Sequence, residues 1–406
     1  MSITQKRIIR GKRIKPSDDT EYLQQLTKNI LSPNNKLKDF PSLTSSNKID
    51  LSLYALFSLL IKNFIISWYV ESLKLNNIEE FINELIFLFA HICRNIQGRI
   101  NEKFDSFIKL LIIDLPYVIN NHIAKFNEIE KLQVIDNNEE FVKIFLDNYG
   151  IDHIDEYRLL LIESIIKLLL PNENTESEIS KDFIISLFDG IIMGNLIKNF
   201  SQNYVIWEII GKLCDNNDND EKKKDTSKRD LIKLFIIDDK YNMKFDNWLK
   251  FTDFSPILQL INIITLCDNK FPLIMTIIKI FIQWIMEFTI IKKFINNFIK
   301  KNIIESLNDE KISKIINELR HLMFPNDDKF DMKPRFIPNN EDELNEIFEM
   351  NIRKILKFLK NKSIINNNNE EIRVNNLLKL FKYQEINEIL IQNLIDILIK
   401  CIFPEI

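Results

Sequence analysis

The scarcity of glycine constrains the fold of this chain more than any other feature. Only 6 of its 406 residues are glycine. Tight β-turns and phosphate-binding loops depend on glycine, because it reaches positive φ without a steric penalty. The sequence contains neither a G-x-G-x-x-G nor a G-x-x-x-x-G-K motif, so it lacks the usual nucleotide-binding loops. These features favour a helical protein without a site of that kind.

Apolar residues recur at helical spacing from about residue 49 to the end of the sequence. The first such run has steps of three and four residues and comprises Leu53, Phe57, Leu60, Phe64 and Trp68. This is the period of one face of an α-helix. The opposite face is nearly as apolar, and such a helix lies at the centre of a bundle or lines an apolar cavity. Periodicity cannot separate these two arrangements, but either one predicts an all-α protein.

The charge is balanced overall and concentrated locally. A net charge of −4 gives no general attraction to nucleic acid, so we expect no nucleic-acid partner. Six basic residues crowd the N-terminus: Lys6, Arg7, Arg10, Lys12, Arg13 and Lys15. One interpretation is contact with an anionic membrane surface, where each would contribute about 1 kcal/mol. The other, which we slightly favour, is a solvated, disordered tail.

The reactive side chains form no recognisable centre. The four cysteines are far apart and form no C-x-x-C pair, which predicts buried free thiols in a reducing compartment. The four histidines stand alone, whereas a zinc site needs about four converging ligands. The serines lie within helical patterns and not on glycine-flanked elbows. We therefore expect no metal, no cofactor and no catalytic residues, and a protein that is not an enzyme.

Composition divides the chain into four parts. Residues 1–45 are polar and predict a flexible basic segment. Residues 215–240 begin with DNNDNDEKKKDTSKRD, which cannot bury apolar area and predicts a charged linker. The linker separates two helical domains, at 46–214 and 241–406.

Two stretches imitate membrane spans. Leu51–Val70 and Phe271–Ile295 are long and apolar, but each carries a lysine in its interior. A central lysine costs roughly 2.5–3.5 kcal/mol on insertion into a bilayer. We therefore expect both to be buried helices of a large helical domain. The N-terminus has no apolar segment after its charges, so we expect no secretory signal.

The first helical domain carries four short motifs in order. They are Ser67-Trp68-Tyr69, Ala90-His91-Ile92-Cys93-Arg94, Asp114-Leu115-Pro116 and Asn121-His122. In this order and spacing, they resemble the PX-associated (PXA) domain of sorting-nexin-related proteins. Pro116 marks a helix start or a kink, since proline cannot donate a backbone hydrogen bond.

The end of the chain carries a second resemblance. Its residues are Leu319-Arg320, Phe324-Pro325-Asn326, Leu394, Asp396, Leu398 and Phe403-Pro404-Glu405. They are similar to the sorting-nexin C-terminal (nexin-C) domain, although Phe324 stands where that family usually has tryptophan. The layout is similar to that of small fungal PXA proteins at contacts between the nuclear or endoplasmic-reticulum membrane and the vacuole.

These resemblances imply that the two domains pack together around an apolar cavity that takes up fatty acids or phospholipids. We expect non-enzymatic lipid binding or transfer by a cytoplasmic protein that is peripheral at ER or nuclear envelope–vacuole contacts. Its partners would be a lipid, a membrane surface and a membrane-anchored PXA-family tether. The alternative is a scaffold that binds such a tether and carries no lipid.

Six side chains are candidates for the lipid site: Phe64, Trp68, Tyr69, His91, Arg94 and Trp284. His91 and Arg94 lie one helical turn apart and could hold a headgroup or a carboxylate. A structural hydrogen-bond network between helices is the commoner use of such residues. The aromatic residues could line the cavity or mark a membrane-facing rim, and core packing is their commoner use.

Overall fold

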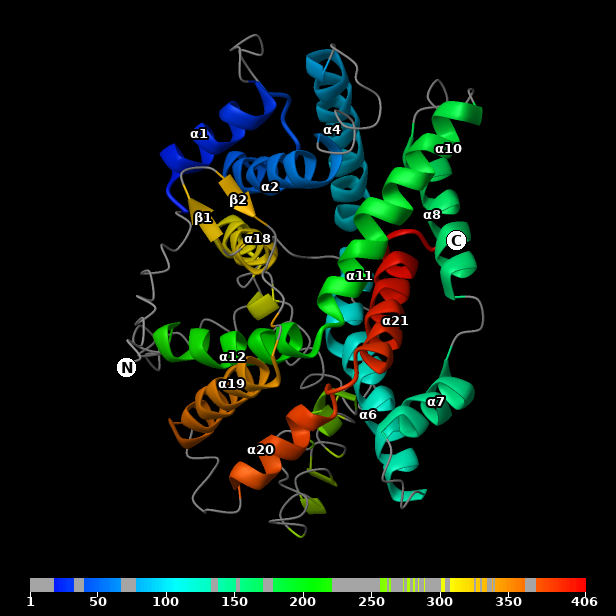
Figure 1. Cartoon of the computed structure of the whole chain (residues 1–406), viewed down its shortest axis with the longest axis vertical. Coiled ribbons are helices and arrows are strands. Elements are labelled where there is room, and N and C mark those ends of the chain that lie inside the picture. The colour runs from blue at the N-terminus through cyan, green and yellow to red at the C-terminus, as the bar shows by residue number, and fades with distance from the viewer. Residues whose placement is uncertain are drawn as a thin grey trace, which may run out of the picture. The chain divides into compact units, whose positions relative to one another are not determined.

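The computed structural model confirms an all-α protein (Figure 1). The structure describes residues 18–32, 40–66, 78–132, 138–150, 154–170, 178–220, 256–260, 307–324, 326–328, 331–333, 340–361 and 370–406, with scattered positions between 263 and 303 and at 338. Within these ranges the one exception to helix is an antiparallel pair of short strands, β1 (Asn326–Asp328) and β2 (Asp331–Lys333).

The chain forms two compact units, and each combines an early and a late segment of the sequence. Unit 1 comprises residues 1–95 and 307–337, and unit 2 comprises residues 96–306 and 338–406. Both units therefore contain helices from before and after the predicted linker at 215–240. The predicted PXA-like and C-terminal parts thus pack together within each unit.

Unit 1 is built around α2 (Asn47–Leu60), which packs against α1 (Thr20–Leu31) and α18 (Asp309–Met323). The π-helix η1 (Ile61–Ile66) continues α2, and α4 (Ile78–Glu102) begins in this unit. The core contains Leu26, Leu59 and Phe324, all of which are fully buried. Apolar residues on the facing surfaces of these helices hold this unit together.

Polar groups are also buried where α2 meets α18. The hydroxyl of Ser52 lies 2.7 Å from that of Ser313, and the amide of Asn317 donates to Ser52 at 3.2 Å. Arg320 is completely buried and donates to Asp18 at 2.8 Å. Buried polar groups are costly unless they are paired. The bonds at Ser52 therefore fix the position of α18 on α2, and the Arg320 bond ties α18 to the segment that leads into α1.

Unit 2 begins with the last turns of α4 and contains most of the helices. In chain order they are α5 (Phe104–Lys109), η2 (Leu110–Asp114), α6 (Leu115–Leu132), α7 (Asn138–Tyr149), α8 (Ile154–Leu169), α10 (Glu178–Ser186), η3 (Leu187–Met193), α11 (Gly194–Phe200), α12 (Asn203–Asp220), α19 (Glu341–Asn361), α20 (Glu370–Lys379) and α21 (Gln384–Ile402). Helix α12 runs past the predicted start of the linker at residue 215.

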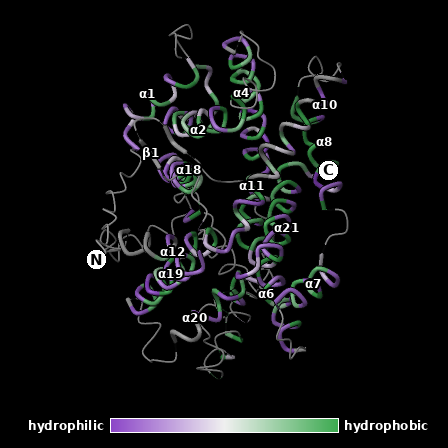
Figure 2. Tube along the Cα trace, viewed as in Figure 1, coloured by the Kyte–Doolittle hydropathy of each residue, from purple (hydrophilic) through white to green (hydrophobic). Residues whose placement is uncertain are grey.

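Helices from both ends of the sequence form the core of unit 2. Helix α12 packs on α19, and α21 packs on α6, α7 and α11. Figure 2 shows α21 as largely hydrophobic, whereas α19 mixes hydrophilic and hydrophobic residues. A helix with apolar residues on most faces needs neighbours on several sides, and α21 has them.

Close contacts lock α12 into this core. A Cβ at Gly211 would lie 2.2 Å from Oδ1 of Asn351 on α19, so only glycine allows this approach without a rearrangement. The indole nitrogen of Trp207 donates to the carbonyl of Leu378 at 2.9 Å. Helix α12 is thereby fixed to both α19 and the end of α20.

Helix α6 begins where the sequence predicted a start or a kink. Pro116 is its second residue, and the π-helix η2 lies immediately before it. Proline lacks the N–H that would complete the α-helical ladder, and its ring crowds the preceding turn. Wider π-type hydrogen bonding at 110–114 accommodates this interruption.

Among the residues that the structure describes, two helical stretches are long and apolar enough to cross a membrane, at Asn47–Ile66 and Phe104–Lys131. Within their apolar windows, 44% and 39% of the residues are buried in the protein. Length and composition are weak evidence for a span, because core helices pass the same test. The predicted stretch Phe271–Ile295 lies mostly outside the described residues.

Candidate ligand pockets beside helix α6

The predicted lipid-site residues of unit 1 lie in different surroundings. Phe64 is half-buried in η1 beside the core, and its ring centroid lies 6.3 Å from that of Phe324. Trp68 and Tyr69 lie outside the described residues, so their predicted role in lining a lipid cavity stays a prediction.

His91 and Arg94 are both exposed on α4. The Nε of Arg94 donates to the backbone carbonyl of Ser42 at 2.8 Å, and a second guanidinium nitrogen lies 3.4 Å from the Ser42 hydroxyl. Arg94 therefore ties α4 to the segment that leads into α2. This contact matches the structural interpretation of the motif, and a headgroup role for the pair stays a prediction.

Trp284 is 60% exposed and contacts two other aromatic rings. The ring centroids of Phe281 and Phe288 lie 6.5 Å and 5.1 Å from its own. Leu273 and Ile277 are also exposed on the described part of this segment. The six basic residues from Lys6 to Lys15 lie outside the described residues.

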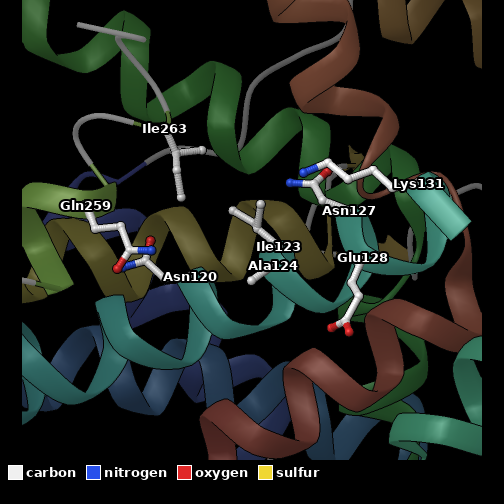
Figure 3. Close-up of a pocket in the computed structure, with 8 residues that line it drawn as sticks. All are labelled: Asn120, Ile123, Ala124, Asn127, Glu128, Lys131, Gln259 and Ile263. Carbon is white, nitrogen blue, oxygen red and sulfur yellow. The ribbon is translucent and has the colours of Figure 1, made fainter. Parts of the chain in front are cut away.

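Two pockets that the sequence did not predict lie beside α6 in unit 2. The larger, called here the apolar pocket, has a volume of about 510 Å³. Figure 3 shows its lining. The lining residues are Asn120, Ile123, Ala124, Asn127, Glu128 and Lys131 from α6, with Gln259 and Ile263 from the segment that follows residue 255.

The apolar pocket has a hydrophobic middle and polar ends. Ile263 faces Ile123 across the middle, while the amides of Asn120 and Gln259 lie together at one end (Figure 3). Lys131 lies at the other end, and the Glu128 carboxylate points away from Ile263 (Figure 3). This arrangement suits an elongated molecule with an apolar body and a polar group.

Asn120 leaves one hydrogen-bond acceptor unused in this pocket. Its side chain is 4% exposed, and its Nδ2 donates to the carbonyl of Pro256 at 2.7 Å. No described residue donates to its Oδ1, which is itself buried. A buried acceptor without a partner costs roughly 1–3 kcal/mol, so a ligand O–H or N–H placed there would relieve a real penalty.

The smaller pocket, called here the cationic pocket, lies between α6, α7 and α21. Its volume is about 190 Å³. Lys125 and Lys400 contribute ammonium groups, while His122, Phe145 and Ile389 contribute buried surface. Asn121 and Lys400 are exposed, whereas His122, Phe145 and Ile389 are buried and form the floor of the pocket.

The single carboxylate that lines the cationic pocket is already engaged. Asp396 accepts a hydrogen bond from the Tyr157 hydroxyl at 3.0 Å and another from the Gln392 amide at 2.9 Å. Lys125 lies 4.6 Å from the centre of the Tyr149 ring, and Tyr149 donates to Glu128 at 2.8 Å. Neither Lys125 nor Lys400 forms an ion pair with any residue in the described ranges.

His122 is neutral at physiological pH because of its surroundings. Its side chain is 4% exposed, and its ring packs edge-on against Phe145 at 5.7 Å. Burial, with a smaller contribution from the nearby Lys125 charge, lowers the pKa of His122 to about 4. Its Nε2 is buried and has no hydrogen-bond partner among the described side chains and backbone.

The cysteines that the structure describes are free, as the sequence predicted. Cys93, Cys214 and Cys401 are half-buried, not fully buried, since each lies on a helix surface partly covered by its neighbours. Burial beside Asp50 raises the pKa of the Cys93 thiol to about 12, which makes it unreactive at neutral pH. Within the described ranges, no three histidine, cysteine or acidic residues converge as metal ligands.

Sequence reasoning had a partial signal for the cationic pocket and little for the apolar one. Asn121-His122 was predicted as a family motif, and both residues line the cationic pocket. Asp396 belonged to the second set of motifs and lines it too. The apolar pocket depends on the segment after residue 255 approaching α6, which no local pattern indicates.

Residues 46–213 match the family model of the PXA domain, which confirms the resemblance inferred from the motifs in this part of the chain. The match extends from the start of α2 into α12 and includes all of α6. No curated protein and no solved structure matches this chain.

Proposed function

We propose that this protein binds a fatty acid or phospholipid non-enzymatically and transfers it between membranes. The observation that carries the proposal is the apolar pocket, with its hydrophobic middle and polar ends. Its volume of about 510 Å³ lies in the range of small-molecule sites and suits one acyl chain of such a lipid, not a whole two-chain phospholipid. Affinity would come from burial of acyl chain, at about 0.8 kcal/mol per methylene.

The C-terminal helices support a paired-domain arrangement of the sorting-nexin type. The carboxylate of Glu405 accepts a hydrogen bond from Arg99 on α4, and the Arg99 guanidinium lies 4.6 Å from the centre of the Phe403 ring. Both C-terminal residues belong to the F-P-E motif that resembles nexin-C. A PXA-like helix thus holds the end of that motif, as expected if the second domain is a nexin-C relative.

The place of action follows from the same resemblance. We propose a cytoplasmic protein, peripheral at ER or nuclear envelope–vacuole contacts, with a membrane-anchored PXA-family tether as a partner. The basic residues Lys6 to Lys15 would add attraction to an anionic membrane.

A second candidate function is a scaffold that binds such a tether without carrying lipid. The exposed apolar group at Leu273, Ile277, Phe281, Trp284 and Phe288 favours it. Contiguous exposed apolar residues mark interaction surfaces more often than chance. The two functions differ in whether ligand occupies the apolar pocket.

Lipid loading tests the proposal directly. The protein purified from cells would be extracted and analysed by native mass spectrometry, then loaded with oleic acid or dioleoylphosphatidylcholine. We expect stoichiometric lipid. Consistent absence of lipid, together with no uptake of either probe, would leave the scaffold as the remaining function.

A cavity-filling variant locates the lipid. Ala124 is exposed at the pocket, so Ala124→Trp should fold while its indole occupies the space. We expect oleic acid loading to fall about tenfold, equivalent to losing roughly two buried methylenes. Glu130→Trp is the matched control, since Glu130 is exposed on α6 and lines neither pocket. Equal loading by both variants would place the lipid elsewhere.

A further inference from the structure

We propose that the cationic pocket is a binding site for a phosphate group, separate from the apolar pocket. The two pockets lie on different faces of α6. Residues 120, 123, 124, 127, 128 and 131 line one, and residues 118, 121, 122 and 125 line the other. With about 100° of rotation per residue, the centres of these two sets point well over a quarter-turn apart. The helix itself therefore separates the sites.

The charges that line the pocket select an anion. Lys125 and Lys400 each present an ammonium group that no described carboxylate neutralises by an ion pair. Both oxygens of Asp396 already accept hydrogen bonds, one from Tyr157 and one from Gln392. Glu128 accepts a hydrogen bond from Tyr149 but does not line the cationic pocket. The donors to Asp396 are neutral and leave its negative charge in place, but the two ammonium groups outweigh it and give the lining a net positive charge. An anion is therefore favoured over a cation and can accept charge-assisted hydrogen bonds from the lysines.

Size and donor number favour phosphate among anions. The volume of about 190 Å³ is below the usual range of roughly 300–1,000 Å³ for drug-sized ligands, so the pocket holds a small group. Two ammonium groups and the side-chain amides of Asn121 and Asn393 supply several donors around it. A tetrahedral phosphate presents several oxygens in different directions, which suits donors that come from two helices.

The floor of the pocket contains a second, independent indication of a ligand. His122 is buried, lines the pocket, and leaves Nε2 without a partner among the described residues. Buried polar atoms normally have partners, and a ligand oxygen at the floor would provide one. The Nε2–H tautomer of the neutral ring would donate to it.

The phosphate can come from a lipid headgroup or from free phosphate, and both present the same chemistry. Titration calorimetry with inorganic phosphate tests the site itself. We expect Lys400→Gln to weaken phosphate binding about tenfold, equivalent to about 1.4 kcal/mol, because the variant loses a charge-assisted hydrogen bond. Lys400→Arg should retain most of the affinity. Lys143→Gln is the control, because it removes one exposed positive charge from α7 outside the pocket.

Vesicles distinguish the two sources. The protein is mixed with phosphatidylcholine vesicles, with and without phosphatidic acid. The site is assigned to a lipid headgroup if the wild type binds only the vesicles that contain phosphatidic acid and Lys400→Gln does not bind them. Binding of inorganic phosphate without binding to vesicles would assign it to free phosphate. The proposal fails if the wild-type protein binds neither probe, or if the double variant Lys125→Gln, Lys400→Gln binds phosphate as the control does.

The phosphate site and the lipid proposal can fail separately. Lys400 does not line the apolar pocket, so Lys400→Gln should load oleic acid like the wild type. Loss of phosphate binding with intact loading would therefore report on the cationic pocket alone. Folding of each variant is checked by circular dichroism and thermal unfolding.

Discussion

The two faces of α6 differ in chemistry although one short sequence produces both. On the face toward residues 259 and 263, an isoleucine and an alanine form the middle of the apolar pocket. On the face toward α7 and α21, Lys125 and the buried His122 of α6 line the cationic pocket, together with Lys400 of α21. Asparagine, lysine and apolar residues occur on both faces. The neighbouring elements therefore decide whether a polar residue of α6 lies at the end of the apolar pocket or in the cationic pocket.

The largest expected effect is a loss of stability when a side chain in the floor of the cationic pocket is truncated. Phe145 is completely buried and packs against His122 and Tyr149. Phe145→Ala should lower the free energy of unfolding by about 3–5 kcal/mol, since it removes contacts and leaves a cavity. Ile123→Ala, at the wall of the apolar pocket, should cost less, because space already lies beside it. Urea unfolding measures both, and equal losses would contradict the difference between the two faces.

The next effect is a pH dependence of stability that comes from His122, on the cationic face of α6. The pKa of His122 is lowered from 6.5 to about 4, so between these values the unfolded chain binds a proton that the folded chain does not. Stability from this group is complete above pH 6.5 and is lost as pH falls toward 4. The loss should approach about 3 kcal/mol.

His122→Gln removes this titration without removing the polar group. We expect its unfolding free energy to change less than that of the wild type between pH 7 and 4.5. This pH range covers most of the interval between the unfolded and folded pKa values of His122. Lys125, Lys400 and Asp396 face the same pocket and remain in both proteins. Parallel pH profiles for the two proteins would show that His122 is not buried as a neutral ring.

The smallest expected effect on stability is that of a substitution in the apolar pocket. Asn120→Leu removes one hydrogen bond to Pro256 and also removes the buried acceptor that has no partner. These contributions oppose each other, so the unfolding free energy should change by less than about 1 kcal/mol. Binding of a ligand that donates to Oδ1 should weaken more than this. A calorimetric comparison of oleic acid with oleyl alcohol would detect the difference, because the alcohol keeps its hydroxyl proton at neutral pH.

A good part of the fold was predictable from local patterns. The apolar periodicity predicted an all-α protein, Pro116 predicted an irregularity at the start of α6, and the motifs predicted the PXA domain that residues 46–213 match. These features depend on backbone hydrogen bonding and on residues close in sequence. Arg94 was also noted for a polar role, and it pairs with Ser42, which precedes the neighbouring helix.

The candidate sites were less predictable, since they depend on residues far apart in the chain. Asn121-His122 and Asp396 were each noted as parts of separate motifs, but their meeting in one pocket is a property of how α21 packs on α6. Asn120 and Lys400 carried no signal in the sequence. An asparagine or a lysine on an amphipathic helix is ordinarily solvated, and only its neighbours make it part of a site.

The sequence by itself determined the helices, because their periodicity, breaks and scarcity of glycine are local properties. The tertiary structure alone decided that early and late helices share each compact unit and that α6 has a pocket on either side. The physical reason is that a pocket is space left between elements that do not fill it. Its volume and charge depend on which side chains meet there, and sequence periodicity records only the face of the helix that carries them.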